Sequence, residues 1–204
     1  MKKTLDSIYD TYKIPLFAWD LTAGPTILKN QSDAIAYLKH VEIGLQSAKL
    51  SPACHINKAC DFGWTPLLAV SYEAGLFSNR GKTVYLDIVR LLLQFPGIDP
   101  NMTCPMGTTA LHIAARSHNT EMIKLLLDFP GLDVNAVDNY GRTPLHSALK
   151  TSVFSRRLVC RCEESVKLLL ARPGIWIDHP DFQGVTPRML AIRNGYFKVS
   201  KYLS

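Results

Sequence analysis

The segment 74–83, AGLFSNRGKT, carries the residue types of a phosphate-binding loop: two glycines, then a lysine and a threonine. Such a loop cradles phosphate oxygens on backbone N–H groups and has four residues between its glycines, whereas Gly75 and Gly81 are separated by five. A phosphate-binding loop also follows a β-strand, and this segment follows a helix predicted to begin at Thr65. The sequence therefore predicts that this segment does not hydrolyse nucleotides. The only binding left for it is weak, nonspecific binding of an anion to free N–H groups at the start of the next helix.

The five cysteines are the other candidates for metal or nucleophilic chemistry. Neither Cys54 and Cys60 nor Cys160 and Cys162 have the spacing of two to four intervening residues that is typical of structural zinc pairs. No motif brings together a nucleophile, a base and an orienting acid, so we expect no enzymatic activity, no cofactor and no metal. An odd number of cysteines without a disulfide-framework spacing favours a reducing compartment.

The composition is that of a folded protein, with 47% hydrophobic and 20% charged residues in a chain of 204. No apolar run reaches the roughly 18 residues of a membrane span. Acidic and polar residues follow the N-terminal lysines where a secretory signal has its apolar run. Most of the formal net charge of +6 lies in residues 101–204, which hold 13 Lys and Arg against 8 Asp and Glu. Because no recognised nucleic-acid module accompanies these cations, we do not expect nucleic-acid binding.

An internal repeat organises the rest of the chain. A glycine lies two residues before the leading threonine of each copy, and an Asn or Asp lies eight residues before it. Thr followed by Pro predicts a helix N-cap with Pro at the first helical position. Apolar stripes such as EMIKLLLD predict a second helix, which a following Pro-Gly pair ends. The four copies are TPLLAV (65–70), TTALHIAA (108–115), TPLHSA (143–148) and TPRMLA (186–191).

This pattern resembles the ankyrin repeat, and DNYGRTPLHSA (138–148) is close to the consensus of that family. The resemblance implies an all-α helix-turn-helix solenoid of about five repeats in a single domain, residues 1–204. It also implies that His112 and His146 hydrogen-bond between repeats. The expected units are a capping helix (1–13), a degenerate repeat (14–56), repeat one (57–100), repeat two (101–134), repeat three (135–177) and a terminal repeat (178–204).

The leading threonines are 44, 34 and 43 residues apart, whereas the family period is about 33. We therefore predict insertions between the paired helices of repeat one, within 76–85, and of repeat three, within 151–162, on either side of a repeat two of standard length. The second insertion carries Arg156, Arg157 and Arg161. These arginines belong either to a solvated loop or to a second contact site for an acidic surface, a phosphate or an anionic headgroup.

The resemblance implies partner binding through the turn tips and the first helices of the repeats, which together form a concave face. Large apolar side chains at solvated tips, with arginines beside them, are typical of interface hot spots. The alternative is that some of these rings pack on the neighbouring turn. We expect a monomer that binds another protein with apolar anchors flanked by acidic or phosphorylated residues. The predicted partner-binding residues are Phe62, Trp64, Tyr72, Met106, Arg116, Tyr140, Arg142, Lys150, Phe182 and Arg193.

The sequence therefore predicts a non-enzymatic protein-binding module of the cytoplasm. Its repeat style and long insertions resemble ankyrin-containing effectors of intracellular bacteria, which act in a host cytoplasm. A second interpretation is the targeting segment of a larger enzyme, with the catalytic domain outside this chain; a final repeat without a polar closing unit favours it. The Leu93/Asn101 and Leu127/Asn135 spacings also resemble ankyrin turns that an asparagine hydroxylase of animal cells modifies.

Overall fold

A computed structural model of the chain describes residues 56–57, 59, 63–76, 82–150 and 156–203. All of them lie in one compact unit, residues 53–204. The predicted capping helix, nearly all of the degenerate repeat and Phe62 lie outside the described residues. The described ranges contain helices and turns and no β-strand, which confirms the predicted all-α class. None of the described helices is both long and apolar enough to cross a lipid bilayer.

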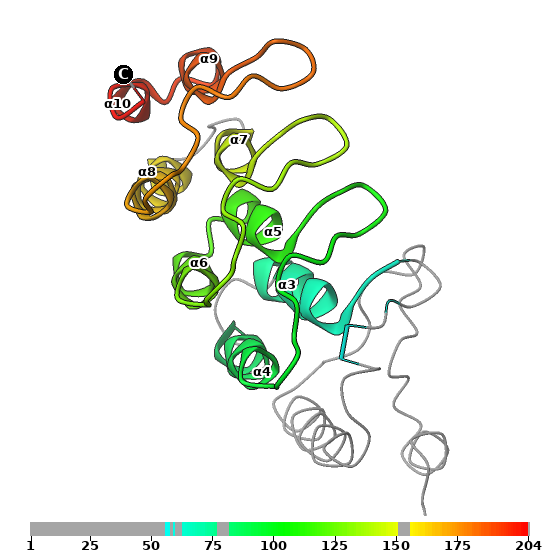
Figure 1. Ribbon diagram of the computed structural model, residues 1–204. Helices are drawn as coiled ribbons and strands as arrows, with labels where there is room; N and C mark the ends of the chain where they lie inside the picture. The colour runs from blue at the N-terminus through cyan, green and yellow to red at the C-terminus, as the bar shows by residue number, and fades with distance from the viewer. Residues whose placement is uncertain (1–55, 58, 60–62, 77–81, 151–155, 204) are drawn as a thin grey trace, which may run out of the picture. The chain divides into compact units, whose positions relative to one another are not determined.

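The helices of the described part form four successive hairpins (Figure 1). The first helices of the hairpins stack in one layer and the second helices in another, while the loops that lead into the first helices project as fingers. The hairpins are α3 (Pro66–Leu76) with α4 (Lys82–Leu93), α5 (Ala110–Arg116) with α6 (Thr120–Leu127), α7 (Pro144–Leu149) with α8 (Arg156–Leu170), and α9 (Pro187–Arg193) with α10 (Phe197–Ser200).

Each first helix begins immediately after its leading threonine, as the sequence predicts. The Thr109 hydroxyl accepts a hydrogen bond from the backbone N–H of His112, and the Thr186 hydroxyl accepts one from Met189. These bonds satisfy N–H groups that have no partner inside the first helical turn. The second helices α4, α6 and α8 end before the Pro-Gly pairs, whose glycines adopt the positive φ that favours glycine.

The core lies between the two helix layers and between successive hairpins. One position of the first helices holds a small residue in three consecutive hairpins, Ala114, Ala148 and Ala191, and each is fully buried. Small side chains at this point allow neighbouring helices to approach closely. Opposite them, the second helices bury Leu126 and Leu169 completely, and each such leucine contributes about 1.5–3 kcal/mol through removal from water.

The recurring asparagine of each repeat joins that repeat to the next. Its carboxamide N–H donates to the carbonyl of the Pro-Gly glycine one repeat later, and its carboxamide oxygen accepts from the backbone N–H two residues beyond that glycine. The recurrence of asparagine is therefore a requirement of stacking. The bonded sets are Asn57 with Gly97 (2.7 Å) and Asp99 (2.9 Å), Asn101 with Gly131 (2.9 Å) and Asp133 (2.8 Å), and Asn135 with Gly174 (2.8 Å) and Trp176 (2.8 Å).

Part of the extra length of repeats one and three forms helix. α4 has 12 residues and α8 has 15, whereas α6 of the standard-length repeat has 8. Arg156, Arg157 and Arg161 lie within α8, so the loop interpretation is wrong for these arginines. A helix can form across this segment because RRLVCRCEES contains neither Gly nor Pro. Residues 77–81 and 151–155 lie outside the described residues.

The turn between α5 and α6 holds a buried histidine in an unusual backbone conformation. His118 has φ +51°, where Gly195 of the last hairpin has φ +78° at the equivalent position. Its side chain is only 4% exposed, and neither ring nitrogen has a hydrogen-bond partner within the part of the chain that the structure describes. Burial, and then the nearby Arg161 guanidinium, lower the pKa of His118 to about 4. The ring is therefore held neutral in the folded protein.

We predict that Asn101→Ala lowers the free energy of unfolding by about 1–2 kcal/mol, because it removes two hydrogen bonds between repeats. Urea denaturation monitored by circular dichroism measures this loss. Gln183→Ala, at an exposed finger residue, is the control and is expected to change stability by less than about 0.5 kcal/mol. Equal stability of the two variants would show that the asparagine bonds do not join the repeats.

We predict that His118 makes the fold sensitive to mild acid. The unfolded chain binds a proton near the ordinary pKa of 6.5, while the folded chain does so only near 4, so stability is complete above pH 6.5 and is lost as the pH falls. Between pH 7 and pH 5 this loss amounts to about 2 kcal/mol. Buried Glu73, whose pKa burial raises to about 7, acts in the opposite direction. The measurement is therefore urea denaturation of the wild type and of His118→Asn at pH 7 and at pH 5. The quantity compared is the difference between their free energies of unfolding at each pH. A difference that does not change with pH would contradict the buried, unpartnered ring.

Candidate partner-binding surface

The fingers that lead into α5, α7 and α9 are turns closed by their own backbones. The N–H of Asp138 donates to the carbonyl of Arg142 at 2.9 Å, and the N–H of Asp181 donates to the carbonyl of Val185 at 2.9 Å. Successive fingers are also joined to each other, because the N–H of Phe182 donates to the carbonyl of Tyr140 at 2.9 Å. The fingers therefore hold their side chains on a hydrogen-bonded backbone that continues from one repeat to the next.

The histidines of the TPLH-type strings support this framework. The Nε2 atom of His112 lies 2.8 Å from the carbonyl oxygen of Arg142, and that of His146 lies 3.1 Å from the carbonyl oxygen of Val185. Because a carbonyl oxygen can only accept, Nε2 is the protonated nitrogen in each ring. Burial is the main cause that lowers the pKa of both rings. The predicted role of these histidines, hydrogen bonding between repeats, is confirmed.

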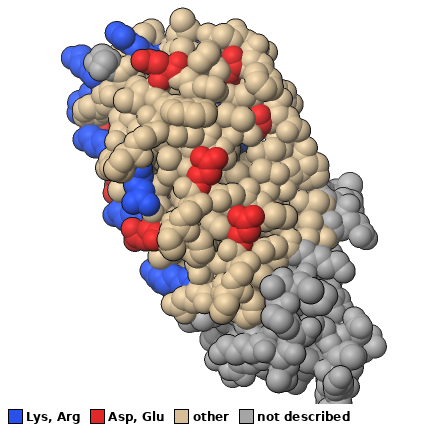
Figure 2. Space-filling model, in the orientation of Figure 1, with Lys and Arg blue, Asp and Glu red and all other residues tan. Residues whose placement is uncertain are grey.

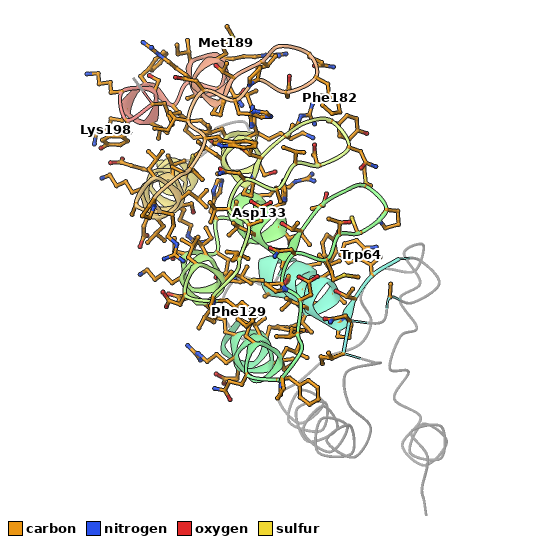
Figure 3. All side chains as sticks on the ribbon, viewed as in Figure 1. Trp64, Phe129, Asp133, Phe182, Met189 and Lys198 are labelled. Carbon is orange, nitrogen blue, oxygen red and sulfur yellow. The ribbon has the colours of Figure 1, made fainter. Side chains whose placement is uncertain are left out.

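Four of the predicted aromatic or apolar contact residues are exposed. Tyr72 is 41%, Met106 55%, Tyr140 47% and Phe182 77% exposed. Trp64 is half-buried, and its ring meets that of Tyr72 edge to face with centroids 5.6 Å apart. Figure 3 places Trp64 and Phe182 at the finger side of the first helices, away from Lys198 on the second-helix side.

The ring of Phe182 also packs on the neighbouring finger, as the alternative interpretation expects. A Cβ atom added at Gly141, which has φ +75°, would lie 2.5 Å from Phe182 Cδ1. Glycine is therefore required under this ring. Because the ring still exposes most of its surface, the contact with Gly141 positions it without covering it.

Three cations recur at one position of successive first helices. Arg116, Lys150 and Arg193 each lie seven residues after a leading threonine, at the end of α5, α7 and α9, and all three side chains are exposed. The structure gives none of these three an ion pair with a described carboxylate. Burial, and then the Arg142 and Arg116 guanidinium groups, lower the pKa of Lys150, so cations of repeats two and three lie within electrostatic range of one another.

Arg142 differs from these three because it is already engaged. Its Nε atom lies 3.4 Å from Oδ2 of the buried Asp181, and its guanidinium carbon lies 4.8 Å from the centroid of the Tyr140 ring. Burial alone would raise the pKa of Asp181, but hydrogen bonds from the Val185 and Gln183 N–H groups and from Arg142 outweigh it and lower the pKa. Arg142 therefore joins two fingers.

The three arginines of the proposed second contact site lie at different places on α8. Arg156 and Arg157 occupy the first turn of α8, while Arg161 is half-buried beside the His118 ring. A role for the three arginines in binding an anion stays a prediction. Among the described residues, no group of three or more His, Cys, Asp or Glu side chains is placed to hold a metal ion.

Several exposed apolar side chains fall at positions that sequence reasoning did not select. Met189 is 56% and Ile192 50% exposed on α9, although the equivalent side chains of inner repeats, such as His146 and Leu149, are fully buried under the next hairpin. Comparison of the last repeat with the others, position by position, would have found them. Val137, Trp176, Ile177 and Phe197 are further exposed apolar residues.

Charged side chains are unevenly distributed over the surface shown in Figure 2. Lys and Arg gather along the side of the second helices, and acidic residues are scattered over the middle. Several of these cations are paired within their own helix: Arg90 with Asp87 at 2.6 Å in α4, and Lys167 with Glu163 at 2.9 Å in α8. Exposed pairs of this kind are typical of a solvated surface.

Stacked two-helix units joined through hydrogen-bonded fingers define a helical-repeat protein of the solenoid class. The family model for ankyrin repeats, in three copies, matches residues 78–170. Residues 78–170 are therefore ankyrin repeats, and ankyrin repeats indicate a protein–protein interaction module. A search of curated proteins gave no match.

We predict that Arg142→Gln lowers the free energy of unfolding by about 1–2 kcal/mol, because buried Asp181 loses its ionic partner. Arg116→Gln removes the same charge from an unpaired, exposed position and is expected to change stability by less than about 0.5 kcal/mol. Thermal and urea denaturation of both variants measure the difference. Equal stability would contradict the structural role of the Arg142–Asp181 pair.

Proposed function

We propose that the chain binds another protein through a surface that we call the finger face. One observation supports this proposal above the others: each of four consecutive repeats presents a large apolar side chain on its finger, and three of them also present on the first helix a cation that pairs with no described carboxylate. The finger face consists of Trp64, Tyr72, Met106, Arg116, Tyr140, Lys150, Phe182 and Arg193, with Phe62 and Arg142 as its further predicted members.

Folding gives no reason for Met106 to be apolar or for Arg116, Lys150 and Arg193 to be cationic. The asparagine, histidine and glycine positions satisfy the backbone of the fingers, while Met106 and Tyr140 leave about half of their surface in water. Aromatic residues, Met and Arg are the types that carry most of the energy in protein interfaces. The partner that fits this face offers apolar anchors flanked by acidic or phosphorylated residues.

The proposed function is non-catalytic. The rings of His112 and His146 are committed to hydrogen bonds between repeats, and burial lowers their pKa and holds them neutral. The proposed setting is a reducing cytoplasm, in agreement with the buried, unpaired thiols of Cys104 and Cys162. The repeat style supports action as a monomeric effector of an intracellular bacterium in the host cytoplasm.

We predict that the double variant Met106→Ser, Arg116→Glu loses capture of the native partner while keeping its thermal stability, because both side chains are exposed and Arg116 pairs with no described carboxylate. Quantitative affinity capture from the native cell, compared with wild type, is the measurement. The control is Phe197→Ser, Lys124→Glu, which makes matched changes at exposed positions of α10 and α6, away from the fingers. Capture of the same proteins by wild type and the double variant would refute the finger face.

A further inference from the structure

Two positions of each repeat lie next to each other: the finger residue immediately before the leading threonine and the first-helix residue seven positions after it. In the first of the four hairpins these residues are Trp64 and Tyr72, whose rings meet edge to face with centroids 5.6 Å apart. Each later repeat has the same order of finger, leading threonine and first helix. We therefore expect the residues at these two positions to be neighbours in every repeat.

Repeat three places two cations at this pair of positions. Arg142 immediately precedes Thr143, and Lys150 follows that threonine by seven residues. Like charges at neighbouring positions repel each other, so folding alone does not favour this pair. The pairs of the other repeats contain at most one cation: Trp64 with Tyr72, Thr108 with Arg116, and Val185 with Arg193.

A third cation approaches from the preceding repeat. Arg116 is the last residue of α5, and α5 packs directly against α7, which ends just before Lys150 (Figure 1). Helices that pack directly are about 8–10 Å apart, a distance that flexible Lys and Arg side chains can span. Burial, and then the Arg142 and Arg116 guanidinium groups, lower the pKa of Lys150, while the Asp138 carboxylate acts in the opposite direction. The three cations therefore lie within electrostatic range of one another.

The nearby carboxylates leave most of this charge available. Asp181 pairs with Nε of Arg142, and no described residue accepts a hydrogen bond from either Nη group of that guanidinium. Asp138 is committed to its own finger, where Oδ1 accepts from the backbone N–H groups of Tyr140 and Arg142 at 2.9 Å. Neither Lys150 nor Arg116 forms an ion pair with a described carboxylate. The cluster therefore offers two cations and the Nη donors of a third to a ligand.

Resting on the proposed function, we infer that Arg116, Arg142 and Lys150 form a binding site for the phosphoryl group of a phosphorylated residue on the partner protein. Such a residue carries a charge of about −1.5 to −2 at pH 7 and three strong acceptor oxygens. One phosphoryl group therefore offsets both Arg116 and Lys150, whereas one carboxylate offsets only one of them. Two carboxylates in the same site would repel each other.

The Arg142 guanidinium is held ready for this ligand. Its carbon lies 4.8 Å from the centroid of the Tyr140 ring, and its Nε atom lies 3.4 Å from Oδ2 of buried Asp181. These contacts leave the two Nη groups as a planar fork, which matches the geometry of phosphate oxygens. Because the side chain is already ordered, it loses little conformational entropy when the ligand binds.

The direct test titrates the full 204-residue chain with three short, blocked glycine peptides. The peptides carry one phosphoserine, one Glu or two adjacent Glu residues at the centre. Amide proton–nitrogen NMR is expected to show the phosphoserine peptide binding about fivefold more tightly than either glutamate peptide, because charge-assisted bonds to one dianion act together. The shifted amide signals are expected to include those of Arg142 and Lys150.

Single variants locate the phosphoserine peptide. Lys150→Gln and Arg116→Gln are each expected to weaken its binding about two- to fivefold, as the loss of an exposed ion pair does. The matched control is Arg193→Gln, which removes an exposed cation at the same helix position of the terminal repeat, where Val185 takes the place of Arg142. It is expected to leave the affinity nearly unchanged.

Affinity capture from the native cell identifies the source of the phosphoryl group. Treatment of the cell extract with a broad-specificity protein phosphatase is expected to reduce recovery of the partner about tenfold, since the partner loses the charge that binds the cluster. Extract treated with the inhibited phosphatase is the control and gives full recovery. Lys150→Gln is expected to reduce recovery from untreated extract, whereas Arg193→Gln is expected to reduce it less.

Equal affinity for the three peptides, no binding of the phosphoserine peptide, or an equal effect of Arg193→Gln would each overturn the phosphoryl site. Capture that survives phosphatase treatment would overturn its assignment to the partner. These failures remain distinct from failure of the proposed function. If phosphatase leaves capture intact while Met106→Ser, Arg116→Glu abolishes it, the phosphoryl ligand is wrong and the finger face stands. If the double variant still captures the partner, the finger face itself is wrong.

Discussion

The joint between consecutive repeats is the interaction on which the rest of the structure depends. A two-helix unit cannot bury both of its faces alone, so each unit is stable only against its neighbours. Apolar packing supplies the attraction, but backbone groups at the turns still need partners. The carboxamides of Asn101 and Asn135 and the imidazoles of His112 and His146 supply them across the boundary between repeats. These bonds fix the register in which the helices stack.

This constraint divides the finger residues into two groups. Positions that join backbones are committed to stacking: the glycines with positive φ, Asp138 and Asp181, and the two histidines. Other positions of the proposed finger face are exposed and make no such bond with their side chains, and there the chain places Met106 and Arg116. The residues that join the backbones also favour partner binding by the exposed side chains, because side chains held on an ordered backbone lose less entropy when a partner binds.

Sequence reasoning succeeded where the cause of a structure is local. Thr-Pro dipeptides mark helix starts and Pro-Gly pairs mark helix ends because each acts within one turn of backbone. The sequence did not reveal that Arg142 pairs with Asp181, since the two residues meet only when adjacent fingers stack. The helical state of Arg156 was missed for a related reason: the excess length of repeat three was assigned to a loop, whereas part of it extends α8.

The outer face of the last hairpin is less suited to a protein partner than the proposed finger face. Arg188 occupies the position at which Leu111 and Leu145 are fully buried, and Ser200 replaces the buried Ile123. A hairpin of the same kind stacked there would bury the Arg188 guanidinium without a partner, at a cost of several kcal/mol. Exposed Met189 and Ile192 therefore lie on a face that also carries the charge of Arg188. The proposed finger face, by contrast, carries apolar side chains on the fingers and cations at the ends of the first helices, and a single partner can contact both.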